Sequence, residues 1–321
     1  MERWLGFGGQ TLATRSMEPE ENQIPLKRPH FQARGNDLYF LISKRPFCSL
    51  SEEEVELWTH IDGVATVAGL RDRFPRADDA LTRFWKLQLI EFAPSEPKLG
   101  RKRVLIIEPH MDDAILSLGG LMWNQRMETE FTVVSVTGVS NFTSYCRIDR
   151  DYFEIEKVTA LRKQESDLAM QVLGGRHFVL DKHDAPLRYQ EGRWSLDWYR
   201  KNRRGISAYV NHSGTDDEVE SWRESVSATI AQTDAEEIWI PLGIGTSVDH
   251  ETTRNACLWA LMQLPEVAAR ATLRFYHEVP YANNFPEHNA RLLKALERAG
   301  ARLRRVENDI GDSLAVKQRL I

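Results

Sequence analysis

Short apolar runs of strand type alternate with helical patterns along the chain from about residue 104 onward. The strand-like runs are Val104–Ile107, Phe131–Val136, His177–Leu180, Ile238–Ile240 and Leu273–Tyr276. Helical patterns lie between most of them, for example at Glu154–Leu173, where apolar residues recur on one face. Because alternating strands and helices build a mainly parallel sheet covered on both faces, we predict an α/β, Rossmann-like domain over residues 101–321.

The pattern before residue 94 is different. A strand-like run at Leu38–Ile42 precedes three short helical patterns within residues 49–85, and an apolar run at Leu89–Phe92 closes the segment. A strand, three helices and a strand predict a small winged-helix-like α+β module over residues 35–97.

Two stretches frame this module. Residues 1–34 mix Gly, Pro, Glu, Gln and Arg without sustained periodicity, which predicts a loosely ordered N-terminal arm. The segment Pro94–Gly100 is rich in helix breakers and polar residues. We therefore place the domain boundary there.

Composition excludes several classes of protein. The 321 residues carry a formal net charge of -5, so no overall basic field draws the chain onto nucleic acid or anionic lipid. No apolar run reaches the roughly 18 residues that span a bilayer, and the N-terminus lacks the pattern of a secretory signal. Three cysteines without CxxC spacing indicate neither a disulfide framework nor a thiolate metal site. We expect a cytoplasmic protein that binds neither nucleic acid nor membranes.

A group of polar residues follows the first strand of the larger domain. The run Val104–Ile107 leads into His110, Asp112 and Asp113, directly before a helical pattern. An imidazole and a carboxylate three residues apart at a strand-to-helix turn can converge on one cation and suit zinc. As an alternative, Asp112 or Asp113 caps the helix and His110 bonds a backbone group.

This segment resembles the opening motif of the PIG-L or LmbE-like family of N-acetylglucosaminyl deacetylases. The family has Pro-His-Pro-Asp-Asp after a strand, and Pro109–Asp113 departs from it at Met111. Further matching blocks are Arg162-Lys163-Gln164-Glu165 with Ala169 and Leu173-Gly174, Pro241–His250, and Phe275-Tyr276 with Val279–Ala282. The resemblance covers residues 104 to about 282. Family members often continue beyond a segment like Leu314–Ile321, so we expect the chain to be shortened at its C-terminus.

The N-terminal module is similar to the PqqD-like, peptide-binding winged helices. The similarity rests on Leu50-Ser51-Glu52-Glu53, Trp58 and the Ile61-Asp62-Gly63 turn, within residues 36–93. It implies a carrier or peptide partner for the module.

The resemblance to the deacetylases implies a ligand set and a mechanism. His110, Asp113 and His250 become the ligands of one zinc ion per chain, with a position left open for water. Asp112 becomes the general base for attack of the zinc-bound water on an acetyl carbonyl, and it then protonates the departing amine.

One departure concerns the oxyanion. The family usually has a histidine three residues before its last ligand, where this chain has Ser247, a residue that can donate a hydrogen bond but carries no charge. We hypothesise that His277 supplies the missing imidazole from a neighbouring strand end, the alternative being a surface histidine. Asp249 is expected to hydrogen-bond His250 or to cap the following helix.

Two arginines complete the candidate residues. Arg147 follows a strand in a polar segment and is our candidate for holding a phosphate or carboxylate of the substrate, the alternative being a solvated arginine. Arg162 and Glu165 lie three residues apart on a predicted helix, so we expect them to pair and to support the metal loop.

These observations favour a zinc-dependent N-deacetylase that acts on an N-acetylated amino sugar or sugar conjugate of the GlcNAc type. One alternative is a catalytically impaired metal-binding or scaffold protein whose winged helix binds a peptide. Another is a metal-dependent sugar-nucleotide transferase, although magnesium favours oxygen ligands over histidine. The Gly pattern of a nicotinamide dehydrogenase is not present after the first strand. Oligomeric state is left open.

Overall fold

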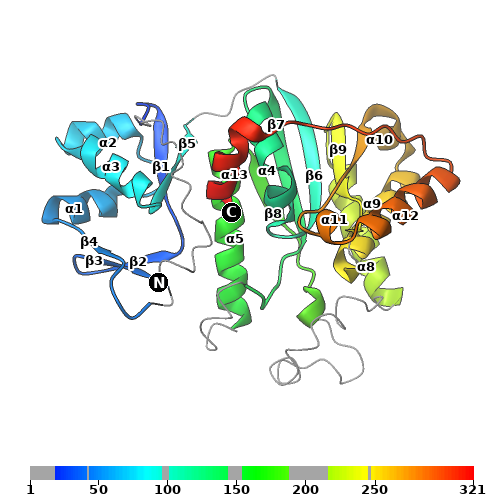
Figure 1. Cartoon of the computed structure of the whole chain (residues 1–321), viewed down its shortest axis with the longest axis horizontal. Coiled ribbons are helices and arrows are strands. Elements are labelled where there is room, and N and C mark those ends of the chain that lie inside the picture. Colours follow the sequence, from blue (N-terminus) through cyan, green and yellow to red (C-terminus); the bar gives the residue numbers. More distant parts are fainter. Residues whose placement is uncertain (1–18, 42, 96–100, 144–153, 188–215, 245–246) are drawn as a thin grey trace.

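The computed structural model describes residues 19–41, 43–95, 101–143, 154–187, 216–244 and 247–321 (Figure 1). Short strands and helices form an N-terminal part, on the left of Figure 1, and a larger α/β part is built on one sheet. This arrangement confirms the predicted fold class. The precise domain boundaries stay a prediction.

The helices of the N-terminal part are α1 (Glu52–His60), α2 (Val67–Arg73) and α3 (Ala77–Lys86). The start of α1 is a capping box: Ser51 Oγ accepts a bond from the Glu54 N–H at 3.2 Å, and the Glu54 carboxylate accepts one from the Ser51 N–H at 2.8 Å. These reciprocal bonds satisfy backbone donors that the first turn of a helix leaves free.

Two small antiparallel sheets accompany these helices. Their strands are β2 (Phe31–Arg34), β3 (Asp37–Phe40) and β4 (Cys48–Ser49) in one sheet, and β1 (Gln23–Lys27) and β5 (Ile90–Pro94) in the other. Leu38, Trp58 and Phe84 are among the buried residues that join helices and strands in one apolar core. The likeness to a winged helix stays a prediction.

The predicted loose arm is wrong for its last residues. Residues 23–34 contain β1 and β2. Residues of β1 pair with β5, so that Gln23 lies opposite Pro94 and Lys27 opposite Ile90. Because this partner lies more than sixty residues along the chain, the local pattern, interrupted by Pro25, gave no sign of a strand.

The central sheet has five parallel strands, in the order β10 (Thr272–Tyr276), β9 (Glu237–Pro241), β6 (Lys102–His110), β7 (Thr129–Thr137) and β8 (Arg176–Val179). The chain runs outward from β6 through β7 to β8 and then returns to the other side of β6 with β9 and β10. Ligands in such sheets bind at the carboxyl ends of the strands, near this reversal of strand order.

Helices cover both faces of the sheet (Figure 1). They are α8 (Asp216–Ala231) and α9 (Val248–Gln263) on one face, and α4 (Asp113–Gln125) and α5 (Ile155–Val172) on the other. Leu105 and Ile107 of β6 pack toward α8 and α9, whereas Val104 and Ile106 pack toward α4 and α5. Both faces are therefore buried, which explains the continuous apolar runs. Among the described residues, no helix is both long and apolar enough to cross a membrane.

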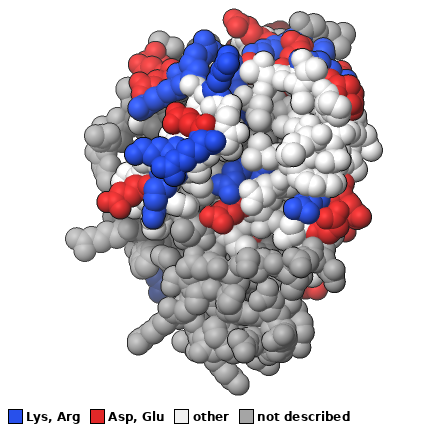
Figure 2. All heavy atoms as spheres, turned by 90° about the vertical axis from the view of Figure 1, so that its right-hand side faces the viewer, with Lys and Arg blue, Asp and Glu red and all other residues white. Residues whose placement is uncertain are grey.

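The surface on the side of α12 (Pro286–Arg298) carries charges of both signs. Figure 2 shows Lys and Arg side chains gathered on one part of this face, with Asp and Glu among them. The α12 sequence supplies Arg291, Lys294 and Arg298 together with Glu287 and Glu297. The face thus has a mixed character, in keeping with the small net charge of the whole chain.

The C-terminal helix α13 (Leu314–Leu320) joins the two parts of the molecule. It packs against α4, and its Arg319 reaches Glu91 of β5 at 2.8 Å. Arg28 binds the same Glu91 oxygen at 2.7 Å. These three side chains are only 8–16% exposed. One buried carboxylate therefore compensates two guanidinium groups from opposite ends of the chain.

We expect Glu91→Ala to lower the free energy of unfolding by about 3–5 kcal/mol, because it leaves Arg28 and Arg319 buried without their counter-charge. Urea unfolding followed by tryptophan fluorescence measures the change. Glu307→Ala is the control, since Glu307 pairs with Arg305 in an exposed contact whose loss costs less than about 1 kcal/mol. Equal stability of the two variants would contradict a structural role for the Glu91 cluster.

Candidate metal centre

The candidate site begins in the loop between β6 and α4. His110 is the last residue of β6, and Asp113 is the first residue of α4. The His110 N–H donates to Asp113 Oδ2 at 3.0 Å, and the Ala114 N–H donates to the buried Glu108 carboxylate at 2.6 Å. Backbone N–H groups at the strand end and at the helix start therefore hold the two carboxylates, and the short loop keeps His110 and Asp113 close together.

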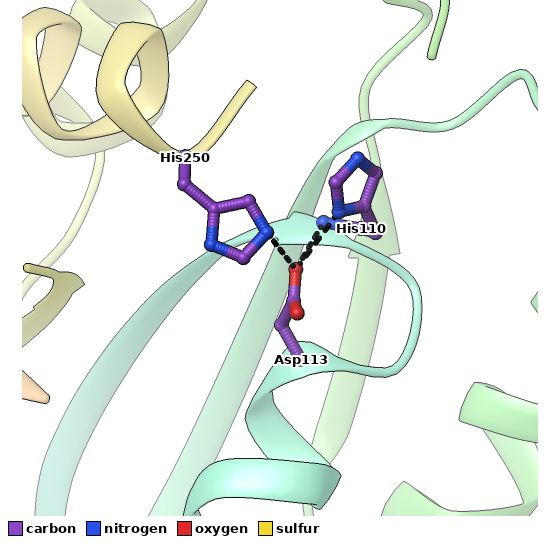
Figure 3. A group of neighbouring side chains, drawn as sticks. All are labelled: His110, Asp113 and His250. Carbon is purple, nitrogen blue, oxygen red and sulfur yellow. Dashed lines mark hydrogen bonds and ion pairs between the residues drawn. The ribbon is translucent and has the colours of Figure 1, made fainter. Parts of the chain in front are cut away.

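His250 joins them from the first turn of α9. Its Nε2 lies 3.4 Å from Asp113 Oδ2, and His110 Nδ1 lies 3.0 Å from the same oxygen (Figure 3). Figure 3 shows the two imidazoles approaching this carboxylate from separate elements, α9 and β6. Asp113 and His250 are buried. The three residues predicted as ligands therefore converge.

The donor set fits a metal ion. One ligand atom from each of His110, Asp113 and His250 lies within 4.8 Å of the others. The Nε2 atom of His250 is buried and has no hydrogen-bond partner among the described residues, although it faces a carboxylate. Two imidazoles and one carboxylate form a ligand set typical of catalytic zinc.

Charges inside the site shift its pKa values in the metal-free protein. Burial alone would lower the pKa of His110, but the carboxylates of Asp184, Asp113 and Asp249 raise it well above its usual value. Burial would also lower the pKa of His250, but the Asp113 carboxylate and a hydrogen bond to Glu278 raise it above its usual value. The two imidazoles in turn lower the pKa of Asp113 to about 2, against the effect of burial.

Glu278 is a site residue that the sequence analysis missed. It follows β10, is fully buried, and lies with Oε1 3.2 Å from His250 Nδ1. The same carboxylate accepts bonds from the N–H groups of Leu242, Gly243 and Ile244 at 3.2, 2.6 and 3.1 Å. Gly243 has a φ of +80°, a conformation that glycine adopts readily and that lets three successive N–H groups point at one anion.

His277 does not face the metal ligands, contrary to the hypothesis. It is exposed, and its Nδ1 lies 3.4 Å from the Asn289 side chain. Because neighbouring side chains at the end of a strand alternate in direction, Tyr276 and Glu278 turn inward and His277 turns outward. The residue that turns toward the ligands is Glu278, one position later.

Asp249 holds a different histidine from the one expected. Its Oδ2 lies 3.0 Å from His110 Nε2 and accepts a bond from the Ala185 N–H at 2.9 Å. Asp184, a second residue that the sequence analysis missed, lies 3.5 Å from the same His110 nitrogen. A proton on His110 Nε2, held by these carboxylates, leaves Nδ1 free to bind a metal. Asp184 follows the carboxyl end of β8, and this position in the sequence is the signal that could have indicated a site residue.

Asp112 lies beside the ligands with its carboxylate accessible. Its side chain is 52% exposed and its Oδ1 lies 2.8 Å from Nη2 of Arg162. Arg162 is buried and also donates to the Phe142 carbonyl at 3.2 Å. The expected partner of Arg162, Glu165, instead binds His30 of the N-terminal part at 2.6 Å. Arg162 thus supports the loop through Asp112.

Of two further predicted site residues, Ser247 and Arg147, the structure describes only Ser247. Ser247 is buried at the N-cap of α9, and its side chain makes no capping bond. Arg147 lies outside the described residues. The substrate role suggested for Arg147 therefore stays a prediction.

The site thus places two imidazoles and a carboxylate at the point where the strand order of the parallel sheet reverses, which is where α/β proteins bind ligands. Residues 105–261 match the model of the PIG-L family, described as GlcNAc-PI de-N-acetylase. The match includes His110, Asp112, Asp113 and His250, and it ends before Glu278. The resemblance seen in the sequence is thereby confirmed, and the family is one of enzymes that hydrolyse amide bonds.

Solved structures with partial similarity include a deacetylase in complex with teicoplanin, from the biosynthesis pathway of teicoplanin. It is 21% identical, with a TM-score of 0.47, over 61% of this chain and 86% of that one. N,N'-diacetylchitobiose deacetylase from Pyrococcus horikoshii is 16% identical, with a TM-score of 0.38, over 69% of this chain and 77% of that one. Values this low describe a limited likeness in fold and say nothing about activity. No curated protein matches the chain.

We expect Glu278→Gln to weaken zinc binding by about 10–100-fold, because the uncharged amide orients His250 less firmly than the carboxylate. Competition with a chromogenic chelator measures the affinity, and circular dichroism checks that the variant is folded. Glu287→Gln, on the exposed surface of α12, is the matched control. A folded Glu278→Gln variant with unchanged affinity would show that Glu278 serves only the backbone of residues 242–244.

Zinc affinity should rise with pH between about pH 6 and pH 8. His110 and His250 both have raised pKa values without metal, so they hold protons that zinc has to displace, and affinity is lost as the pH falls. Calorimetric titration with zinc, in buffers of different ionisation enthalpy, measures the protons released. An affinity independent of pH in this range would contradict the proposed ligand set.

Proposed function

We propose that the chain is a zinc-dependent N-deacetylase that hydrolyses the acetamide of an N-acetylated amino sugar or sugar conjugate of the GlcNAc type. The observation that carries this proposal is the buried Nε2 of His250, which faces the Asp113 carboxylate beside His110 and has no hydrogen bond among the described residues. The match of residues 105–261 to the model of a family described as GlcNAc-PI de-N-acetylase supports the reaction type.

Zinc is the ion that this donor set favours. His110, Asp113 and His250 would hold it through two imidazole nitrogens and one carboxylate oxygen, whereas magnesium favours oxygen ligands and water. When bound, zinc lowers the pKa of a water molecule to about 7 and polarises a carbonyl group.

Asp112 is the general base in this proposal. It is the neighbour of a ligand without belonging to the ligand set, and its half-exposed carboxylate is open to a substrate. The Arg162 guanidinium fixes one carboxylate oxygen at 2.8 Å, which leaves the other for proton transfer. The exposure of Asp112 and its contact with Arg162 support this role.

The reaction needs one water and returns the base to its starting state. Asp112 takes a proton from the attacking water while the water oxygen bonds to the acetyl carbon. The protonated Asp112 then gives that proton to the amide nitrogen as the C–N bond breaks. Acetate and a free amine are the products.

We further propose that residues 35–97, together with the strands β1 and β2 that pair with them, form a module of their own, which recruits a carrier or peptide. Support comes from the apolar core of this part, whose buried members all lie between Leu38 and Phe92. A shared core of this kind is typical of a separately folding unit.

The test is release of free amine from p-nitrophenyl N-acetylglucosaminide and from N,N'-diacetylchitobiose, together with zinc content by mass spectrometry. We expect Asp112→Asn to keep its zinc but to lose about 10²–10⁴-fold in kcat, the contribution of a general base. His250→Ala should lose both zinc and turnover, because it removes a ligand.

Asp72→Asn, an exposed position on α2, is the control for a lost carboxylate and should behave as the wild type. Stoichiometric zinc without turnover of any amide by the wild-type protein would overturn the deacetylase proposal and favour a metal-binding scaffold. Full activity of Asp112→Asn would leave the deacetylase but remove Asp112 as its base.

A further inference from the structure

Amide hydrolysis places a negative charge on the carbonyl oxygen of the substrate, and enzymes supply hydrogen-bond donors for it. In the described part of this site, the buried cation Arg162 is already engaged by Asp112 and by the Phe142 carbonyl. Ser247 is 6% exposed and has only a short, uncharged side chain. Among the described residues, an accessible donor for this oxygen would have to come from another element.

Tyr281 brings a phenol to the ligands from a different element. It is the first residue of α11 (Tyr281–Asn284), three positions after Glu278 at the end of β10. Its ring packs edge-on against the His250 ring, with centroids 5.0 Å apart and planes at 78°. The Tyr281 side chain is only partly buried.

The hydroxyl of Tyr281 is available. It makes no hydrogen bond with any described residue, although a tyrosine hydroxyl in a partly buried position usually finds a partner. Tyr276 provides the contrast: it lies five residues earlier in the chain, is buried, and donates to the Ile107 carbonyl at 3.1 Å. The two tyrosines near the end of β10 thus differ: the Tyr276 hydroxyl donates to a backbone carbonyl, whereas the Tyr281 hydroxyl makes no hydrogen bond with the described residues.

The charges around Tyr281 are those of the site. Burial raises the pKa of Tyr281, and the charged groups that act on it are Asp113, His110, Asp112 and Asp184. Its phenol therefore lies in the same electrostatic environment as the ligands and Asp112, rather than on the outer surface of α11.

We propose that Tyr281 is a further catalytic residue, whose hydroxyl donates a hydrogen bond to the carbonyl oxygen of the scissile amide as that oxygen becomes negative. This role rests on the proposed deacetylase function and names the residue that takes the place of a donor at position 247. The ring packing on His250 holds the phenol beside a predicted metal ligand, and a donor already in place at the site is the arrangement that stabilises an oxyanion.

The alternative is that Tyr281 only packs against His250 and holds its ring. Tyr281→Phe separates the two roles, because it keeps the aromatic ring and removes only the hydroxyl. A packing role predicts that kcat does not change. A donor role predicts a lower kcat, because the hydrogen bond is strongest in the transition state, where the oxygen is negative.

The experiment compares the zinc-loaded wild type, Tyr281→Phe and Tyr39→Phe, the last being a partly exposed tyrosine of β3 in the N-terminal part. With p-nitrophenyl N-acetylglucosaminide, Tyr281→Phe should lose about 100-fold in kcat, as expected for one oxyanion donor, with KM nearly unchanged. Zinc content should stay at the wild-type level, and Tyr39→Phe should match the wild type throughout.

Ligand binding gives a readout that does not depend on turnover. An N-methylphosphonyl derivative of glucosamine presents a tetrahedral, negatively charged group in place of the acetyl carbon. Calorimetry should show its Kd raised at least about 10-fold in Tyr281→Phe, while the Kd of glucosamine itself stays the same.

Three outcomes would overturn the proposal. Wild-type kcat together with wild-type affinity for the phosphonyl compound would leave Tyr281 as a packing residue only. A loss of zinc in Tyr281→Phe would assign its effect to the metal centre. A wild-type protein that holds zinc but releases no amine would overturn the proposed function itself, and the role of Tyr281 with it.

Discussion

The site depends on the convergence of two imidazoles on one buried carboxylate, that of Asp113. A carboxylate removed from water needs compensation, and the fold provides it from two places that are distant in the sequence. His110 ends β6, and His250 lies in the first turn of α9, the helix that follows β9, which pairs with β6. Because both strands run in parallel, their carboxyl ends bring the two histidines to the same edge of the sheet.

Around these three residues lies a second set of charges that is more negative than positive. Asp249 and Asp184 contact His110, and Glu278 contacts His250. Arg162 offsets only part of this charge, through Asp112 and, at 4.0 Å, Asp184. In the metal-free protein the imbalance is met by protons on the histidines, which explains their raised pKa values. A divalent cation would replace those protons, so the surroundings of the site favour a metal as much as the ligands do.

The sequence predicted those site residues that stand in a recognisable local sequence pattern. His110, Asp112 and Asp113 follow one apolar strand within a few residues, and His250 stands in a block that resembles the family. Glu278 and Asp184 were missed because their roles depend on side-chain direction and on contacts across the sheet. The error at His277 has the same origin, since a shift of one residue at a strand end reverses the direction of a side chain. The strand β1 was missed because its partner β5 is remote in sequence.

The N-terminal part is connected to the site through α5. His30 binds Glu165 at 2.6 Å, and Arg162, three residues earlier on the same helix, holds Asp112. Residues three apart on a helix lie on neighbouring positions of one face, so both contacts depend on the placement of the same helical turn. The buried cluster of Arg28, Glu91 and Arg319 provides a second connection, from the N-terminal part to α13. The position of Asp112 beside the metal ligands is therefore supported by packing that extends well beyond the family's segment, residues 105–261.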